Sequence, residues 1–591
     1  MLLKTTFLLL MTMVLWSLCS AVRAGDRLTP AAGRAGRSVT LATHGMVATS
    51  HPLAVQIGLD VLKNGGNAVD AAIAVNAALG LMEPMSCGIG GDLYALVWDA
   101  KTQKLYGLNA SGRSPYQATR DVFAAKGLDE IPTSGPLSWS VPGCVDGWEE
   151  LRKRFGTRTL AQLLEPSIRY AEEGFPVSSV IAGYWQGGAA RLRRHPDAAR
   201  TYLIDKRAPR AGEVFKNPAL ARSYRLLAEK GRDAFYKGAI ARAIVAFSDK
   251  NGGLFSLKDF ADHTSTWVEP VSTRYRGYQV WEIPPPGQGI AVLEMLNLLE
   301  GYDLKKMGPE SADWWHLFLE AKKLAYADRA RFYADPDFVK VPVKELISKP
   351  YAAQRRKLID MGKAMTRIPA GDPKLEQGDT VYLCVVDKDR NCVSLIQSNY
   401  FGFGSGLVSG ALGFALQNRG CLFALEANHA NRLEPHKRPF HTIIPSLVTK
   451  DGSQSFPERI QRRNHPGGVR TGVPWLVFGV MGGDMQPQGQ VQVLVNLIDF
   501  GMNVQEAGEA PRLEHVGSAT PTGLSGNRGG GTVYAERGIS EKVIKELIRR
   551  GHRVKTVRTN GGGYQGILID PKTNVLHGGS EARKDGCAAG Y

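Results

Sequence analysis

The sequence predicts an α+β protein in which β-sheets are layered between helices. Helical periodicity comes first, at residues 54–64 and 68–81. After residue 380 the chain changes to strand-like runs rich in β-branched residues, beginning with residues 381–387. Helical patterns then return near the C-terminal end, for example at residues 490–500. Strands in the middle, with helices before and after them, are expected to pack as a layered sandwich.

The first elements have clear local signals. Gly65-Gly66-Asn67 separates the two opening helices, and their small, Ala-rich faces suit close helix packing. Residues 93–99 form a strand candidate with a return strand at 104–109, and the polar loop between them is typical of a hairpin. Residues 120–370 are predicted to be mostly helical, with loops rich in Pro and Gly.

The second half is predicted to supply most of the strands. Residues 381–387 and 392–398 are expected to pair across a short polar turn. The remaining elements expected are strands at 441–448, 475–481, 564–570 and 575–577, and helices at 490–500, 504–510 and 541–550.

Two polar segments interrupt this pattern. Residues 363–377 are rich in Pro, Gly and Asp and are expected to be exposed, at a place where a chain would be cut or would change direction. Residues 452–473 stand where a tight turn would suffice, and they are interpreted as a surface insertion.

The N-terminus has the pattern of a secretory signal. A lysine at position 4 precedes an almost wholly apolar run over residues 7–18, and small residues at 21–24 offer a cleavage point. Cys19 raises a lipoprotein alternative, although the residues before it are a poor context for one. No other segment reaches about 18 uninterrupted apolar residues, so no membrane span is expected. The mature protein is therefore predicted to be exported, either periplasmic or secreted.

Composition bounds the possible partners. The 591 residues carry a formal net charge of +17, but the basic residues are spread along segments such as 191–194 and 322–331, without interleaved aromatic residues. We therefore interpret them as a solvated basic face and expect no specific nucleic-acid partner. The six cysteines other than Cys19 show no metal-site spacing, and buried free thiols are expected, although disulfides stay open.

A candidate catalytic residue stands at the start of the strand predicted after residue 380. If the bond between Asp379 and Thr380 were broken, Thr380 would carry a hydroxyl and a free α-amine on one residue. An α-amine has a pKa of about 7.7–8.0, close to the value that suits a general base at neutral pH. Thr380 could thus act as nucleophile and base without a separate His or Asp partner.

A glycine turn can stabilise the anion that such a reaction develops, and two other sites in the sequence compete with Thr380. Gly482 and Gly483 follow a predicted strand and can offer unobstructed backbone N–H groups to a developing oxyanion. Ser405 lacks the strand-to-helix context of a triad serine. The histidines at 429, 436 and 441 have no carboxylate in register, so no metal is expected.

Several motifs in order resemble the γ-glutamyltransferase family, also described as glutathione hydrolases, and most closely its cephalosporin-acylase-like branch. The motifs are Met46-Val-Ala-Thr-Ser-His-Pro-Leu-Ala54, Asn64-Gly-Gly-Asn-Ala-Val-Asp-Ala-Ala72, Ser111-Gly-Arg-Ser-Pro115, Gly378-Asp-Thr-Val-Tyr382, Met481-Gly-Gly-Asp-Met-Gln-Pro-Gln488 and Asp499-Phe-Gly-Met-Asn503. The resemblance implies an N-terminal-nucleophile (Ntn) hydrolase fold, a four-layered αββα sandwich made as a precursor that cuts itself. The signal peptide would be residues 1–24, the large subunit 25–379 and the small catalytic subunit 380–591.

The resemblance also implies roles for individual residues. Thr380 would be the nucleophile released by cleavage after Asp379, and Gly482 and Gly483 would form the oxyanion hole. Arg113 would grip the α-carboxylate of a γ-glutamyl group, as a bidentate guanidinium can. Further substrate contacts are expected at Ser398, Asn399, Tyr400, His441 and Thr442. No cofactor is implied.

Departures from the family pattern weaken the inference to a zwitterionic substrate. The second Thr at the cleavage site is Val381, and the paired aspartates that bind an α-amine fall at Cys421-Leu422. The paired serines of the family are His441-Thr442. The function expected first is a self-processing hydrolase or acyltransferase of γ-glutamyl compounds such as glutathione. An acylase for glutaryl-type amides and a non-catalytic binding protein on the same scaffold are the alternatives.

Overall fold

The computed structural model describes residues 36–366, 379–451, 468–517, 530–559 and 562–591. Residues 40–591 form one compact unit. The expected signal peptide, residues 1–24, lies outside the described residues, as do most of the polar segment 363–377 and residues 452–467 of the expected insertion.

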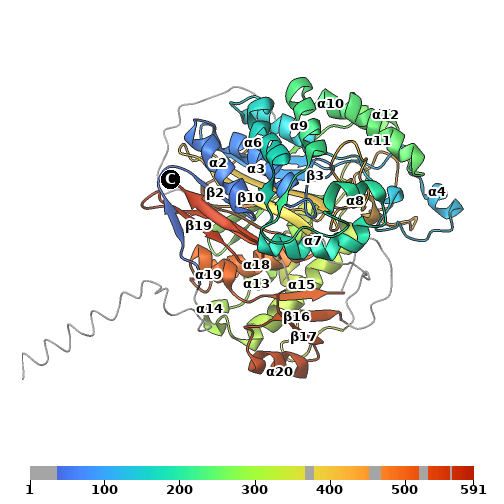
Figure 1. Ribbon diagram of the computed structural model, residues 1–591. Helices are drawn as coiled ribbons and strands as arrows, with labels where there is room; N and C mark the ends of the chain where they lie inside the picture. Colours follow the sequence, from blue (N-terminus) through green and yellow to red (C-terminus); the bar gives the residue numbers. More distant parts are fainter. Residues whose placement is uncertain (1–35, 367–378, 452–467, 518–529, 560–561) are drawn as a thin grey trace, which may run out of the picture. The chain divides into compact units, whose positions relative to one another are not determined.

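One sheet has eight strands and is antiparallel throughout (Figure 1). Its order is β13-β4-β3-β11-β10-β2-β20, with β7 beside β4 outside that path. The strands are β2 (Met46–Thr49), β3 (Asp92–Asp99), β4 (Lys104–Ala110), β7 (Thr266–Val268), β10 (Asp379–Val386), β11 (Cys392–Tyr400), β13 (Val469–Arg470) and β20 (Cys587–Gly590). The strand that begins at Asp379 is therefore interior, with β11 on one side and β2 on the other.

A second antiparallel sheet has seven strands in the order β1-β19-β18-β14-β12-β9-β8. They are β1 (Thr40–Ala42), β8 (Val271–Tyr275), β9 (Tyr278–Glu282), β12 (Ser446–Lys450), β14 (Val473–Val480), β18 (Tyr564–Ile569) and β19 (Leu576–Ser580). Smaller sheets join β15 (Leu513–Val516), β16 (Thr532–Glu536) and β17 (Val554–Val557), and β5 (Phe175–Pro176) with β6 (Val214–Phe215).

The alternation of β10 shows how the two large sheets stack. Val381, Leu383 and Val385 belong to the apolar core on the side of the N-terminal helices. Tyr382, Cys384 and Val386 point the other way, into the core shared with the seven-stranded sheet. Because side chains alternate along a strand, such a run buries both faces of its sheet.

Helices cover the outer faces of both sheets (Figure 1). On the eight-stranded sheet lie α2 (Pro52–Lys63), α3 (Ala68–Met82) and α5 (Cys144–Phe155), and α3 begins with a capping box between Asn67 and Asp70. On the seven-stranded sheet lie α13 (Gly289–Leu299), α18 (Met485–Ile498) and α19 (Val504–Glu509), with α15 (Ala312–Phe332) packed on α13. The fold is a four-layered αββα sandwich, which confirms the predicted class.

The remaining helices extend these layers. They are α4 (Arg120–Ala125), α6 (Leu160–Glu173), α7 (Ser179–Leu192), α8 (Pro196–Tyr202), α9 (Pro218–Lys230), α10 (Asp233–Tyr236), α11 (Ala239–Lys250), α12 (Leu257–Ala261), α14 (Leu304–Met307), α16 (Val343–Leu346), α17 (Lys349–Arg356) and α20 (Glu541–Arg549), with 3-10 turns η1 (Pro136–Ser138) and η2 (Arg419–Leu422).

Three expectations need correction. Three of the four basic residues of α15 are not on a solvated face: Lys322, Lys323 and Arg329 are at most 2% exposed and have acidic or polar neighbours inside the fold, whereas Arg331 is exposed. The expected insertion ends in β13, which pairs with β4 in the eight-stranded sheet. In the segment expected to be exposed, Lys363 and Thr366 are exposed, but Ala364 is buried and its N–H donates to the carbonyl of Arg550.

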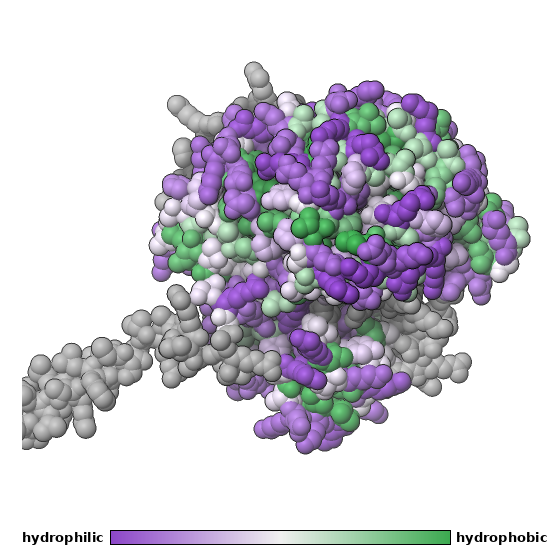
Figure 2. Space-filling model, in the orientation of Figure 1, coloured by the Kyte–Doolittle hydropathy of each residue, from purple (hydrophilic) through white to green (hydrophobic). Residues whose placement is uncertain are grey.

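The thiols follow the expectation. The six cysteines among the described residues are free, and five of them are buried. Figure 2 shows hydrophilic side chains over most of the face in view, with hydrophobic residues in small separate groups. In the part of the chain that the structure describes, no helix has both the length and the apolar character needed to cross a membrane.

Candidate active site

Thr380 lies where β10 is irregular. Asp379 pairs with Tyr400 and Val381 with Gln397, so the register shifts at Thr380. Bulges of this kind re-aim a side chain and occur often beside active sites. Thr380 is 1% exposed, and its Oγ1 donates to the Oγ of Ser398 at 3.3 Å. The threonine singled out in the sequence is thus a buried hydroxyl held at a strand irregularity.

Ser398 and Tyr400 form the opposite side of this irregularity. The backbone N–H of Tyr400 donates to Ser398 Oγ at 2.8 Å, so one oxygen receives hydrogen bonds from both Tyr400 and Thr380. Tyr400 has φ = +79°, which is unusual for a bulky residue. Strained backbone of this type persists where the surroundings enforce it, often at ligand sites.

The glycine pair lies at the end of β14, in the neighbouring sheet. Gly482 and Gly483 have φ of +106° and +55° and lead directly into α18. Their N–H groups have no hydrogen-bond partner among the described residues. Upstream, a Cβ on Gly479 would stand 2.4 Å from the ring of Tyr382, so this glycine lets β10 and β14 pack closely. The start of a helix, with free N–H groups, favours negative charge.

A buried hydrogen-bond network that the sequence did not reveal fixes this turn. We call its residues, Gln288, Arg329 and Asp484, the brace. Gln288 Nε2 donates to the carbonyls of Thr442 at 2.7 Å and Gly483 at 2.9 Å, and its Oε1 accepts from Arg329. Arg329 also forms a forked ion pair with Asp484, at 2.8 and 3.2 Å. The partners are far apart in the chain, so no local pattern could have revealed them.

His441 is buried and has a defined tautomer. Its Nδ1 accepts from the N–H of Ile443 at 3.3 Å, so the proton is on Nε2, which donates to Asp92 Oδ2 at 3.0 Å. Burial, reinforced by the positive charge of Arg419, lowers the pKa of His441 to about 4. The ring is therefore neutral and both its nitrogens are engaged, which makes His441 a positioning residue in this structure.

Thr442 and Arg419 meet beside His441. Arg419 comes from η2 and was not singled out in the sequence. Its Nη1 donates to Thr442 Oγ1 at 2.6 Å, and its guanidinium carbon lies 4.4 Å from the ring centre of Tyr400. The structure therefore brings Thr380, Ser398, Tyr400, Thr442 and the glycine turn into one chain of contacts.

Arg113 and Asn399 are held differently. Arg113 is partly exposed and donates from Nη1 to the carbonyl of Thr264 at 3.2 Å, an oxygen that Arg438 also contacts. Burial, with the like charge of Arg438, lowers the pKa of Arg113 to about 10. Asn399 Nδ2 donates to the carbonyl of Cys87 at 2.9 Å, which ties this amide to the glycine-rich turn before β3. No contact of either residue with Thr380 is seen among the described residues.

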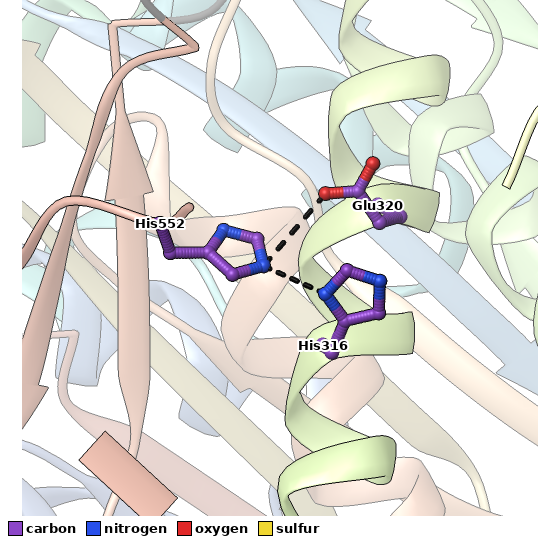
Figure 3. Close-up of side chains that lie close together, drawn as sticks. All are labelled: His316, Glu320 and His552. Carbon is purple, nitrogen blue, oxygen red and sulfur yellow. Dashed lines mark hydrogen bonds and ion pairs between the residues drawn. The ribbon is translucent and has the colours of Figure 1, made fainter. Parts of the chain in front are cut away.

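A second polar cluster has the residue types of a metal site. His316, Glu320 and His552 come together from α15 and the loop after α20, with the ring of His552 facing the other two (Figure 3). His316 Nε2 lies 2.8 Å from the carbonyl of Asp360, which can only accept, so His316 Nδ1 is unprotonated. His552 Nε2 therefore donates to that Nδ1 at 2.8 Å. The donor atoms are already used within the protein.

The same cluster also holds the chain at Met365. Lys323 donates to Glu320 at 2.7 Å and to the carbonyl of Met365 at 2.9 Å, and Glu320 accepts from the Met365 N–H at 3.0 Å. An ammonium on the carboxylate opposes a bound cation. We call His316, Glu320, Lys323 and His552 the Glu320 cluster and interpret it as an anchor for residues 360–365. The triad alternative also fails, since Ser405 Oγ donates to Leu416 O and accepts from Trp139.

Comparisons with known proteins place the chain among characterised families. The model of the gamma-glutamyltranspeptidase family matches residues 54–457 and 466–591. A solved structure, the cephalosporin acylase from Bacillus halodurans, is 42% identical with a TM-score of 0.84, covering 96% of this chain and 99% of that one.

Two curated relatives extend the comparison. The glutathione hydrolase-like YwrD proenzyme of Bacillus subtilis is 38% identical, over 93% of this chain and 99% of its own length. The glutathione hydrolase proenzyme of Escherichia coli is 34% identical, over 93% of this chain and 92% of its own length.

The layered fold and these relatives define the class of the protein: it is an Ntn hydrolase, an enzyme of the hydrolase or transferase type. More narrowly, the chain belongs to the gamma-glutamyltranspeptidase family.

Proposed function

We propose that the protein is a self-processing amide hydrolase whose nucleophile is Thr380. The observation that carries the proposal is the position of this residue. Its hydroxyl is buried at a register shift on an interior strand and is hydrogen-bonded to Ser398. The two relatives described above are both named as proenzymes, which supports a precursor that is cut.

Self-processing begins with attack by Thr380 Oγ1 on the carbonyl carbon of Asp379. The C–N bond breaks as the C–O bond forms, and the nitrogen takes up the hydroxyl proton, leaving an ester and a free α-amine. Water then hydrolyses the ester. The products are residues up to 379 with a new carboxylate and a fragment that begins with Thr380. One residue then holds both nucleophile and base.

Turnover repeats the same chemistry on a substrate amide. The α-amine of Thr380 takes the proton from Oγ1 as the oxygen attacks the carbonyl, and the N–H groups of Gly482 and Gly483 stabilise the oxyanion. The proton passes to the leaving amine as the C–N bond breaks. Water hydrolyses the acyl ester and regenerates Thr380. The brace formed by Gln288, Arg329 and Asp484 keeps the glycine turn in place.

The substrate is an amide whose acyl group carries a carboxylate. γ-Glutamyl compounds such as glutathione fit through Arg113, and transfer to an acceptor amine would share the acyl-enzyme. Glutaryl-type amides are the second candidate. The absence of carboxylates at Cys421 and Leu422 favours them, because an α-ammonium would find no partner there. We expect the enzyme to act after export.

Electrophoresis and intact-mass analysis test the nucleophile. Wild-type protein should yield two fragments, one beginning at Thr380, and Thr380→Ala should remain one chain without activity. Thr380→Ser should still cleave and keep part of the activity, because it retains hydroxyl and amine. Turnover by material that contains no fragment beginning at position 380 would refute the proposal. A panel of γ-glutamyl-anilide, glutathione and a glutaryl amide then identifies the acyl group.

A further inference from the structure

Arg419 is a buried cation whose hydrogen-bonding capacity is mostly unused. The residue is fully buried, and its Nη1 donates to Thr442 Oγ1 at 2.6 Å. Nε and Nη2 have no hydrogen-bond partner among the described residues. These two nitrogens lie on one edge of the guanidinium, the edge that binds a carboxylate with two parallel hydrogen bonds. Buried donors normally find partners, so this free edge requires an explanation.

Among the described residues no carboxylate forms an ion pair with Arg419, and Asp92 acts on its charge only from a distance. The nearby Asp92 is fully committed to other groups: its Oδ1 accepts from the N–H groups of Gly112 and Gly143 and from Gln417, and its Oδ2 accepts from His441. Among the described residues Arg419 has no ion pair. A buried, unpaired cation is costly, whereas an anionic ligand would repay that cost on binding.

The contacts of Arg419 connect it with the two parts of the candidate active site, the nucleophile Thr380 and the glycine turn. Its guanidinium lies 4.4 Å from the ring centre of Tyr400, whose N–H donates to Ser398, the partner of Thr380. On the other side, Thr442 accepts through its carbonyl from Gln288, which also holds Gly483. Arg419 is thus connected through Tyr400 with the Ser398–Thr380 pair and through Thr442 with the residue that holds Gly483.

We propose that Nε and Nη2 of Arg419 bind the terminal carboxylate of the acyl group, so that Arg419 selects monoamides of dicarboxylic acids without an α-ammonium over γ-glutamyl amides. This rests on the proposed function, which supplies the acyl-enzyme at Thr380. A guanidinium attracts a carboxylate and repels an ammonium, and no carboxylate of residues 417–422 is present to receive one. Arg113 then has the secondary role for this acyl group.

Three anilides of equal chain length measure the selection. Glutaryl-p-nitroanilide has the carboxylate, γ-glutamyl-p-nitroanilide adds the ammonium, and pentanoyl-p-nitroanilide has neither. Wild type should show a kcat/KM for the glutaryl substrate at least about 10-fold above that for the γ-glutamyl one. Arg419→Gln should lower glutaryl turnover about 100-fold, mainly through KM, and change pentanoyl turnover by less than about 3-fold. Arg419→Lys should fall between them, because it keeps charge without the fork.

Arg113→Gln is the matched variant, and it should lower glutaryl turnover less than Arg419→Gln does. The inference is overturned if Arg113→Gln has the larger effect, or if Arg419→Gln lowers all three substrates alike. It is also overturned if wild type prefers the γ-glutamyl substrate, although the proposed function then stands. Wild type that is correctly cut before Thr380 yet hydrolyses none of the three would refute the proposed function itself.

Inhibition of the wild-type enzyme tests the selectivity for the acyl group without any variant. It therefore also serves if Arg419→Gln fails to cleave itself. Glutarate should compete at least about 10-fold more tightly than L-glutamate, since the two differ by the α-ammonium. Equal or tighter inhibition by L-glutamate contradicts the role of Arg419.

Discussion

The Glu320 cluster and the surroundings of Arg419 are both buried and charged, but they differ in how their charges are satisfied. In the Glu320 cluster, Lys323 faces a carboxylate and a carbonyl, and the two histidines share one hydrogen bond. Around Arg419, two of the three guanidinium nitrogens lack partners among the described residues. A satisfied cluster stabilises the fold, whereas an unsatisfied one is available to a ligand.

Asp484→Asn tests a buried ion pair that has features of both regions: its charges are paired, as in the Glu320 cluster, and it also holds the glycine turn of the candidate active site. The change leaves the charge of Arg329 without its carboxylate, and we expect a loss of about 3 kcal/mol in the free energy of unfolding. Turnover should fall about 100-fold as well, because the glycine turn loses its brace. Urea denaturation and kcat measured on the folded protein check both effects. Unchanged kcat would separate the brace from catalysis.

Glu320→Gln should damage stability alone. Lys323 keeps a carbonyl partner but loses its counter-charge, so the expected cost is about 2–3 kcal/mol. Activity per folded, processed molecule should stay within about 2-fold, since the cluster makes no contact with Thr380 among the described residues. Glu541→Gln, at an exposed pair with Lys545, is the control and should have no measurable effect. A large loss of kcat would place the cluster in the catalytic machinery.

Low pH should decrease the stability of the folded protein through one buried histidine in each region. Burial, together with Lys323, lowers the pKa of His552 to about 2, and burial with Arg419 lowers that of His441 to about 4. In the unfolded chain these histidines gain protons near pH 6.5, so stability is full above that pH and falls as pH decreases. From pH 7.5 to 5.0 each contributes a loss of about 2 kcal/mol. Denaturation at several pH values should show a shallower slope for His441→Gln and for His552→Gln, and an unchanged slope in both would refute the assignment.

Ser398→Ala should have a smaller effect. It removes one hydrogen-bond partner of the Thr380 hydroxyl, worth about 1 kcal/mol, so kcat/KM should drop about 5-fold while self-cleavage continues more slowly. Single-turnover kinetics with the glutaryl anilide measure it. A loss as large as that of Thr380→Ala would mean that Ser398 takes part in proton transfer.

Arg419→Met should have the smallest effect on stability, with no loss or a slight gain in the free energy of unfolding. Replacing a buried, unpaired charge by an apolar side chain of similar size is often neutral or stabilising. The same denaturation measurement that shows a cost for Glu320→Gln provides the comparison. A cost of several kcal/mol for Arg419→Met would mean that Arg419 is structural like Lys323.

The sequence predicted elements best where one pattern governs them. The helices at 54–64 and 68–81 match α2 and α3, and the strand at 392–398 matches most of β11. It failed where distant partners decide. The helix expected at 490–500 begins at Met485. Its first turns were not predicted because Gln486, Gln488 and Gln490 are polar residues, typical of a loop. In the structure they are buried and hydrogen-bonded to the backbone of other chain segments.

The same limit applied to strands and to the site. The strand expected at 441–448 begins at Ser446, because His441 and Thr442 bond to Pro286 and Gln288 in place of a sheet ladder. The stretch 120–370, expected to be mostly helical, also holds the strands β5 to β9, and two of them pair with strands from elsewhere in the chain: β7 with β4 and β9 with β12. Thr380 and the glycines could be singled out from local chemistry, whereas Gln288, Arg329, Asp484 and Arg419 matter through contacts across the fold.

The order of strands in the two large sheets determines whether the two fragments of a cleaved chain could dissociate and refold. In both large sheets, strands from before residue 379 alternate with blocks from after it: β2 lies between β10 and β20, and β9 adjoins β12. The two chains that the proposed cut before Thr380 would produce are thus interwoven, and they could separate only if both sheets came apart. Once denatured, they would have to find each other again, so recovery would depend on concentration, unlike folding of the uncut precursor.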